Sequence, residues 1–541
     1  MHMKYPYFLG LLFLTFFSLT TLVAQEDDFF QTDVIQDLSI EFEVENWRMA
    51  LDSLRYNGDE LLDATITING TKLEGVGVRI KKSRFFEPDN QKNSLFVRLD
   101  HKKEGQSYQG NRAVLLSQSL RDPSMVREVL AYELARKYMP APRANYAKVQ
   151  VNEEYYGLFV NVEPVDTAFL SRSFGENTGH LFYSNPMLEE QVADYCLDAA
   201  FGNLLGEPDE ECYQRNFQLV KGNSYESFVQ FVRALNSDRA ELRNEFIDID
   251  KTLWMLAYNN TIANLSGYLG KAAPNYFLYQ QADGRFAPIM WNTNFAFGSV
   301  KNIGKGSDLT VDQMEKLDVL LHQNERTKPL VSNLLADDYN RKRYLSHVRT
   351  LVYEEFLSGV FEKRAKALQE LIKEPLMADK NHYYHSTDFD QSLVATIGDI
   401  TRIPGLLSFM NNRTRYLKKT EPLLFVPAEI GTPEAKRRKR YSRDRIENFQ
   451  IQIPVSEFTS SITLYYRFDE NESYQSVRMQ DDGAHYDEAA GDNIYGAIIP
   501  PSEKADKIHF YIVAQNARTI AYAPVRYTQE QFSFSLTDLN K

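Results

Sequence analysis

The chain has 541 residues, 43% of them hydrophobic, which is enough apolar material for several cores and too long for one ordinary domain. Its 61 Lys and Arg face 74 Asp and Glu, giving a formal net charge of -13. This acidic balance repels polyanions and excludes general nucleic-acid binding, while leaving small cationic or metal-chelated partners open.

The first residues predict export. Lys4 precedes an apolar run from Phe8 to Val23, and Ala24 ends that run before an acidic segment. This pattern is typical of a cleaved signal peptide covering residues 1–24, with a retained anchor as the alternative. Later apolar segments are too short to span a bilayer, so we expect a mature chain without a transmembrane anchor. We expect this chain to be secreted or held in the cell envelope, either in the periplasm or at the cell surface.

The segment 34–165 is predicted to be a strand-rich lobe. Residues 64–68 and 75–81 alternate apolar and polar side chains around the hairpin signal Asn69-Gly70, and 94–99 adds a further strand. A helix is predicted with Asp122 as its N-cap, and a second hairpin follows over 147–162.

Residues 166–420 are predicted to form a helix-rich lobe. Helical spacing of apolar residues occurs in four stretches, interrupted by two strand-like runs: 225–234, 253–263, 340–356 and 361–372, with 276–279 and 286–291. Two lobes in this order predict an α+β architecture with a ligand-binding cleft between them.

Cys196 and Cys212 are the two cysteines of the chain. An even pair in an exported protein is first interpreted as a disulfide, the alternative being two unrelated thiols.

The C-terminal part is predicted to be a separate small all-β sandwich over 446–541, preceded by a linker over 421–445. The linker contains the basic run 436–440, which is either solvated or binds an anionic surface. The short alternating strands predict a sandwich of the fibronectin or Ig type, and the loop from Asp481 to Gly496 resembles one found in fibronectin-like extracellular modules. One loop carries clustered carboxylates that could bind Ca²⁺ or, alternatively, close turns through Asx hydrogen bonds: Asp481, Asp482, Asp487 and Asp492.

Several short motifs, in order, resemble the CotH family over about residues 34–417. The first is 75–81, with Gly75, Arg79 and Lys81, and the next strand entry contains Lys92 and Phe96. Asp122-Pro123-Ser124 with Arg127-Glu128 resembles the helix that follows in the family. The remaining motifs are Asn152 with Tyr156-Gly157-Leu158 and Glu163, Asn275 to Tyr279, Pro288 to Trp291, Phe297-Gly298, and Pro404-Gly405 with Arg413.

This resemblance implies a two-lobed atypical protein-kinase-like fold that phosphorylates secreted proteins with ATP and Mg²⁺ or Mn²⁺. Phosphoryl transfer needs a cation beside the phosphates, carboxylates that hold the metal, and a proton acceptor. By the resemblance, the nucleotide-binding residues would be Arg79, Lys81, Lys92, Glu128 and Glu163, and Glu128 could pair with one of the lysines.

The acidic half of the expected site is missing. Ser266, Asn292 and Asn294 stand where the family pattern has catalytic and metal-binding carboxylates, and Asn275 is retained as a possible metal ligand beside Asn292. Neutral amides bring no charge to the metal. We therefore expect a degenerate kinase, a pseudokinase with weakened or absent transfer to a secreted or cell-surface partner.

Two rival hypotheses remain. An active kinase could recruit other acids, of which Asp283, Asp308 and Asp312 are available by sequence. A non-catalytic extracellular binding or structural protein would need no chemistry between the lobes.

Overall fold

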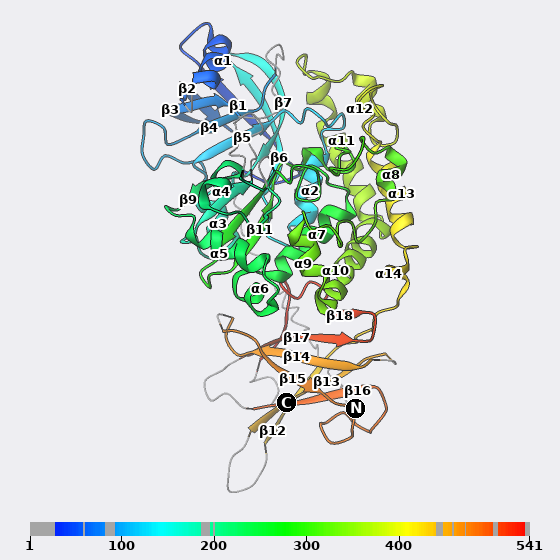
Figure 1. The fold of residues 1–541 in the computed structure, drawn as a ribbon. Helices are drawn as coiled ribbons and strands as arrows, with labels where there is room; N and C mark the ends of the chain where they lie inside the picture. The colour runs from blue at the N-terminus through cyan, green and yellow to red at the C-terminus, as the bar shows by residue number, and fades with distance from the viewer. Residues whose placement is uncertain are drawn as a thin grey trace, which may run out of the picture.

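A computed structural model describes nine stretches of the chain (Figure 1): 28–57, 60–81, 92–184, 195–197, 201–439, 447–456, 459–470, 472–500 and 507–535. The signal-peptide prediction for residues 1–24 lies outside these stretches. The described residues form a mixed α and β protein with several sheets.

The N-terminal part is a closed barrel, in which β6 returns parallel to β1. Its strands, in spatial order, are β1 (Ile35–Glu41), β2 (Leu62–Ile68), β3 (Thr71–Ile80), β4 (Leu95–Arg98), β5 (Ala113–Ser117), β7 (Glu154–Val162) and β6 (Ala144–Val151). Alternate side chains fill the interior, among them Ile66, Val76 and Val97, all fully buried. Both predicted hairpins are present, as β2–β3 and β6–β7.

The expectation of mainly strand before residue 100 misses one helix, α1 (Trp47–Asn57). It packs on β2 and β3 (Figure 1) and buries Leu51 in the barrel core. Its hydrophobic positions follow a helical period, which the strand-based interpretation of this region overlooked.

The predicted start of the next helix is wrong. Helix α2 (Arg127–Ala135) begins five residues after Asp122, which instead closes a turn. The Asp122 carboxylate accepts hydrogen bonds from the backbone N–H groups of Ser124 (3.0 Å) and Arg127 (2.7 Å). It also forms an ion pair with the Arg127 guanidinium, both side chains being fully buried. Arg127 in turn donates to the Pro404 carbonyl, which ties the start of α2 to a distant segment.

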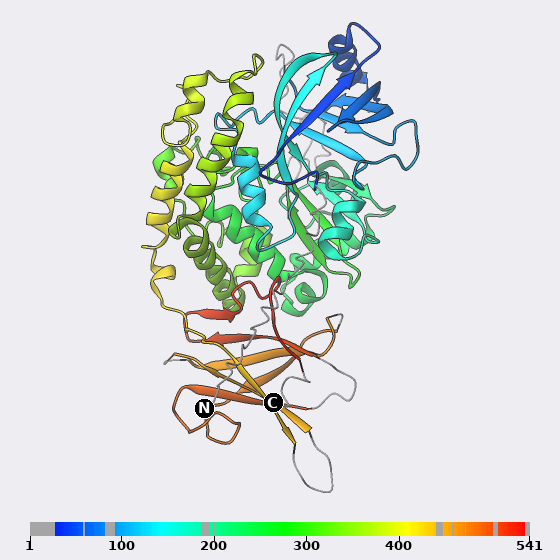
Figure 2. The ribbon, with the colours of Figure 1, turned by 180° about the vertical axis from the view of Figure 1, so that it is seen from behind.

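The middle of the chain combines a second sheet with a helical layer. The sheet has the order β11 (Phe286–Met290), β10 (Tyr276–Gln280), β8 (Leu181–Ser184) and β9 (Phe217–Lys221). Figure 2 shows α2, in cyan, lying beside the helices of the middle part of the chain. The helices are α3 (Thr167–Phe174), α4 (Glu210–Asn216), α5 (Glu226–Leu235), α6 (Ala240–Phe246), α7 (Ile249–Thr261), α8 (Val311–Glu315), α9 (Pro329–Leu335), α10 (Asp338–Leu351), α11 (Val360–Met377), α12 (Ser386–Gln391), α13 (Leu406–Leu417) and α14 (Glu421–Leu424).

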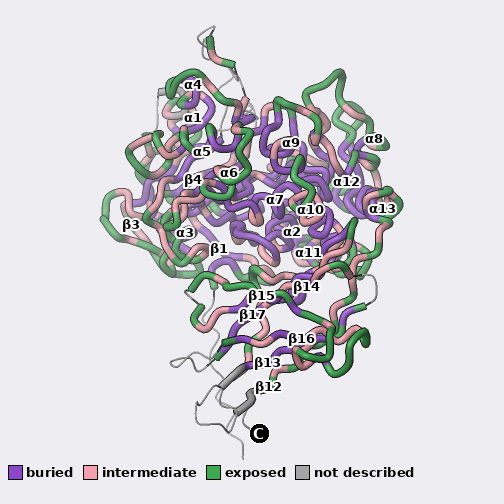
Figure 3. Tube along the Cα trace, turned by 60° about the horizontal axis from the view of Figure 1, so that its bottom comes forward, coloured by how far each residue is buried: buried purple, intermediate pink, exposed green. Residues whose placement is uncertain are grey.

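One large hydrophobic core joins α2, the second sheet and the helical layer. Figure 3 shows the buried chain concentrated around α2, α7, α10 and α11. Helix α2 therefore belongs to the same core as the segments that carry Ser266 and Asn292.

Two further sheets make up the C-terminal part. One has the order β12 (Glu434–Lys439), β13 (Glu447–Pro454) and β16 (Ile494–Ile499). The other has β15 (Gln475–Met479), β14 (Ser461–Arg467), β17 (Lys507–Gln515) and β18 (Ile520–Ala523), with β19 (Phe532–Ser535) paired to β17. Side chains from both sheets fill one hydrophobic cluster. The basic run differs from the linker expectation, because Lys436 to Lys439 lie in β12 and pair with β13.

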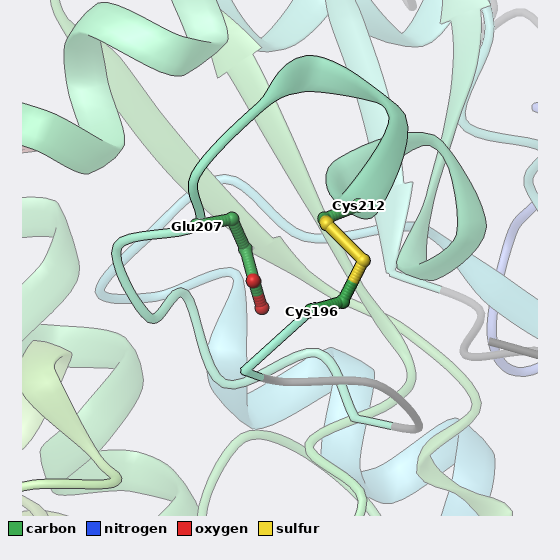
Figure 4. A group of neighbouring side chains, drawn as sticks. All are labelled: Cys196, Glu207 and Cys212. Atoms are coloured by element: carbon green, nitrogen blue, oxygen red, sulfur yellow. A yellow bond between two sulfur atoms is a disulfide. The ribbon is translucent and has the colours of Figure 1, made fainter. Parts of the chain in front are cut away.

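Cys196 and Cys212 form a disulfide that joins a loop to α4 (Figure 4). Glu207 lies beside it, and its carboxylate accepts a hydrogen bond from the backbone N–H of Leu197 at 2.7 Å. Because both sulfurs are bonded to each other, this trio offers no thiolate to a metal.

Candidate functional site

A chain of side-chain hydrogen bonds connects the barrel to the helical part. Lys81, directly after β3, donates from Nζ to Oδ1 of Asn292 at 2.7 Å. Asn292 donates from Nδ2 to Oδ1 of Asn275 at 2.8 Å, and Asn275 donates from Nδ2 to the Ser266 carbonyl at 2.9 Å. We call Lys81, Asn292, Asn275 and Ser266 the amide chain.

The amide chain continues into the interior. Ser266 donates from Oγ to Oδ1 of Asn264 at 2.7 Å, and Asn264 donates from Nδ2 to Oδ1 of Asn259 at 2.7 Å. Asn259 lies on α7 and is buried, as is Asn264. Every link of this network is neutral except Lys81 at its outer end.

Local backbone geometry explains why asparagine suits two of these positions. Asn275 and Asn292 have φ angles of 61° and 50°, in the left-handed region. Asn and Asp enter this region more readily than other non-glycine residues. The backbone therefore accepts either the amide or the carboxylate, and the choice between them sets the charge of the site.

Lys81 lies in a partly buried environment. Burial lowers the pKa of Lys81, and the nearby Glu128 carboxylate opposes that shift. The Lys81 ammonium also lies 5.2 Å from the centre of the Trp291 ring, a favourable cation–π distance. Lys81 is thus the cation of the expected set that reaches the amide chain.

Glu128, on the first turn of α2, is the acid whose negative charge acts on Lys81. Burial raises the pKa of Glu128, while the positive charge of Lys81 opposes this change. Lys81 and Glu128 do not approach within 4.0 Å as an ion pair among the described residues. Oε2 of Glu128 is buried there with no hydrogen-bond partner.

Lys92, expected at the nucleotide, has a different partner. Its ammonium donates to Oδ2 of Asp379 at 2.6 Å and to the Leu158 carbonyl at 2.6 Å. The Lys92 and Asp379 side chains are 3% and 0% exposed. This buried pair fixes β7 to the residues after α11 and leaves Lys92 away from the amide chain.

Glu163 and Arg79 are also held by other groups. The Glu163 carboxylate binds Arg143 at 2.9 Å and Arg172 at 2.7 Å, and it is 3% exposed. Arg79 lies on β3 with its guanidinium carbon 5.0 Å from the centre of the Phe96 ring. The sequence indicated no arginine partner for Glu163.

Asn294 lies on the short helix η1 (Thr293–Phe295) that follows Asn292. It is 8% exposed, and among the described residues its Oδ1 has no hydrogen-bond partner. The neighbouring Thr293 donates to the Glu128 carbonyl at 3.4 Å, which brings η1 against α2.

These residues do not fit a divalent metal. The side-chain oxygens of Asn292 and Asn275 already accept hydrogen bonds, and Asn294 brings one neutral oxygen. Mg²⁺ is usually held by one or two carboxylates together with substrate phosphates. The amide chain contains no carboxylate, so a metal there would depend on the nucleotide alone.

The three acids considered as replacements lie outside the amide chain. Asp283 forms an ion pair with Arg285 at 2.6 Å in the turn between β10 and β11. Asp308 accepts from Asn302 at 2.8 Å, and Asp312 pairs with Lys316 at 2.7 Å.

The carboxylates of the C-terminal loop accept hydrogen bonds from backbone N–H groups. Asp481 accepts from the N–H groups of Gly491 and Asn493, and Asp487 accepts from those of Gly483 and His485. Asp482 accepts from Ala484, and Asp492 from Ala489 and Ile494. These are Asx-type contacts, as the turn interpretation predicts, and Ca²⁺ binding here stays a prediction.

Comparison with known proteins identifies the family. The CotH kinase protein family matches residues 85–417, more than half of the chain. The chain belongs to this family. Inner spore coat protein H of Bacillus subtilis (strain 168) is 23% identical over 372 residues, covering 66% of this chain and 91% of that protein.

The matched span contains Lys92, Glu128 and the amide-chain residues from Ser266 to Asn292, whereas Lys81 lies just before it. A solved structure titled "Crystal structure of Br derivative BhCBM56" aligns over 20% of this chain and 99% of the solved chain, with 9% sequence identity. The TM-score of this alignment is 0.13, and a score this low carries no information about the fold. Among the described residues, no helix combines the length and the apolar character needed to cross a membrane.

Proposed function

We propose that this protein is an exported CotH-family pseudokinase, a two-lobed kinase-like domain followed by a β-sandwich, that transfers phosphate poorly or not at all. The observation that carries the proposal is the hydrogen bond from Lys81 to Asn292, which continues through Asn275 to Ser266. In a site built for metal and nucleotide, those positions would supply negative charge and a proton acceptor.

The lysine would have a different role in such a protein. Its ammonium is engaged by a neutral amide and retains attraction for an anion, because Asn292 does not neutralise its charge. Binding of ATP through Lys81 and Arg79, without strong dependence on Mg²⁺ or Mn²⁺, is therefore compatible with this site. The partner would be a secreted or cell-surface protein, in keeping with the name of the spore-coat relative.

The alternative is a non-catalytic extracellular binding or structural protein in which nucleotide has no part. It is supported by the satisfied hydrogen bonds of Asn292 and Asn275, which need no ligand to complete them. Nucleotide titration separates the two, since the pseudokinase proposal expects binding that Lys81→Met weakens.

The test of catalysis is γ-phosphate incorporation into the protein itself and a generic acceptor. Wild type should stay near background, and the triple variant Ser266→Asp, Asn292→Asp, Asn294→Asp should gain metal-dependent transfer of about 10²-fold, because it restores carboxylates at three sites. The left-handed backbone at Asn292 accepts Asp equally well.

A matched control is Ser386→Asp, Asn223→Asp, Asn411→Asp, which adds the same charge at three exposed positions. Thermal unfolding verifies that each variant is folded. Robust metal-dependent transfer by the wild type would refute the pseudokinase proposal. Inactivity of all three proteins would favour the non-catalytic alternative.

A further inference from the structure

A pocket of about 810 Å³ shares no lining residue with the amide chain. Its walls come from the loop after η1, from the start of α8, from the turn at 400–402 and from Arg121 before α2. Ser299 donates to the Arg121 carbonyl at 2.9 Å, which joins two of these walls. Four chain segments far apart in sequence thus meet around one open hollow.

Three cations and three acids line this pocket, and the cations are Arg121, Lys301 and Arg402. Burial lowers the pKa of Lys301, repulsion from Arg402 and Arg121 lowers it further, and Asp308 acts in the opposite direction. The Lys301 ammonium donates to the Thr401 carbonyl at 2.7 Å. Arg402 and Arg121 repel the Lys301 ammonium, Asp308 offsets part of this repulsion, and an anion bound beside Lys301 and Arg402 would offset more of it.

Arg402 is the most available of the three. Its side chain is exposed, and within the described part of the chain it has neither a hydrogen bond nor an ion pair within 4.0 Å. Its backbone has a φ of 44°, a left-handed conformation that arginine rarely adopts. The turn therefore holds the guanidinium at the pocket in a costly backbone conformation, as is common at binding sites.

The acids of the pocket have donors of their own. Asp308 accepts from Asn302, and Asp312 pairs with Lys316, as described above. Glu315 accepts from Asn412 at 3.0 Å. In the part of the chain that the structure describes, none of these carboxylates forms an ion pair within 4.0 Å with Lys301 or Arg402, although the amide donors leave the negative charges of Asp308 and Glu315 in place.

We propose that this pocket binds the phosphate group of a phosphorylated segment of a partner protein, with Arg402 and Lys301 as its ligands. A guanidinium offers two parallel N–H donors that match phosphate oxygens, and an ammonium adds a point charge. The volume exceeds the needs of a lone phosphate, which leaves space for flanking residues. Ile400, which also lines the pocket, is 95% exposed and offers apolar contact to such residues. This binding function is independent of whether the amide chain supports catalysis.

The test is fluorescence anisotropy with full-length protein and three labelled peptides of one sequence, carrying phosphoserine, glutamate or serine at the central position. Wild type should bind the phosphoserine peptide at least about tenfold more tightly than the serine peptide, because charged hydrogen bonds are gained. The double variant Lys301→Gln, Arg402→Gln should lose about tenfold in affinity for the phosphoserine peptide.

The matched control is Lys271→Gln, Lys305→Gln, which removes the same charge from two exposed lysines near the pocket that do not line it. It should bind within about twofold of wild type, because exposed charges off the pocket contribute little. Arg402→Gln alone keeps the test valid if the double variant unfolds, since among the described residues this side chain has no hydrogen bond or ion pair to lose. Equal binding of phosphoserine and serine peptides, or an equal loss in the control, would overturn the proposal. Inorganic phosphate that binds as tightly as the phosphoserine peptide would also overturn it, identifying free phosphate as the ligand.

Discussion

Asp379→Asn should lower the free energy of unfolding by about 3–5 kcal/mol, because it leaves a buried ammonium without its counter-charge. Oδ2 of Asp379 accepts from Lys92 at 2.6 Å and from the Leu158 N–H at 3.0 Å, and the aspartate side chain is 0% exposed. An amide could keep one of these hydrogen bonds and would lose the charge. Urea unfolding of wild type and variant at pH 7 measures the difference.

The neighbouring backbone is built around the same carboxylate. Gly157 has a φ of 141°, and a Cβ placed there would lie 2.5 Å from Oδ2 of Asp379. The pair therefore occupies a space that a side chain on β7 would fill. Loss of the aspartate charge should loosen the contact between β7 and the end of α11.

The control for this prediction is Asp283→Asn. Asp283 and Arg285 form an ion pair with side chains 48% and 42% exposed, so its removal should cost no more than about 1 kcal/mol. Comparable losses in the two variants would show that the Lys92–Asp379 pair contributes no more than a surface pair does.

Local patterns in the sequence predicted many of the elements. The hairpins β2–β3 and β6–β7 and the helices α5, α7, α10 and α11 follow from spacing and turn residues alone. Ser266, Asn275 and Asn292 were assigned to one site by resemblance, and in the structure Asn275 is hydrogen-bonded to both Ser266 and Asn292.

Partners of charged residues could not be predicted in the same way. Lys92 and Asp379 are 287 positions apart, and nothing local distinguishes this buried lysine from a solvated one. Arg143 and Arg172 around Glu163 are similar cases, since tertiary contacts decide which charges are buried. The start of α2 was misplaced because Asp122 resembles an N-cap, while its carboxylate binds a turn and Arg127.

Two histidines should make the fold sensitive to acid. Burial, assisted by the charge of Lys328 and opposed by a hydrogen bond to the Leu269 carbonyl, lowers the pKa of His322 to about 4. Burial likewise lowers the pKa of His382 to about 4, with Lys92 acting in the same direction. Both rings are therefore neutral in the folded protein at pH 5, where the unfolded chain would bind protons at the same residues.

The direction in which stability changes with pH follows from proton uptake by the unfolded chain. Since the unfolded state binds more protons below pH 6.5, stability is fully present above that pH and is lost as pH falls towards 4. Each histidine should remove up to about 3 kcal/mol over this interval. Urea unfolding at pH 7 and pH 5 should show the loss in wild type, and His322→Asn with His382→Asn should reduce it.

The choice of asparagine keeps other effects small. His322 has a φ of 70°, which Asn adopts readily, and both substitutions retain a polar side chain. His385→Asn, at an exposed histidine that precedes α12, should leave the pH dependence as in wild type. An unchanged loss of stability between pH 7 and 5 in the double variant would contradict the prediction. The acid sensitivity would then be assigned to buried carboxylates such as Asp250. Arg343 and His347 hold the pKa of Asp250 low against the effect of burial.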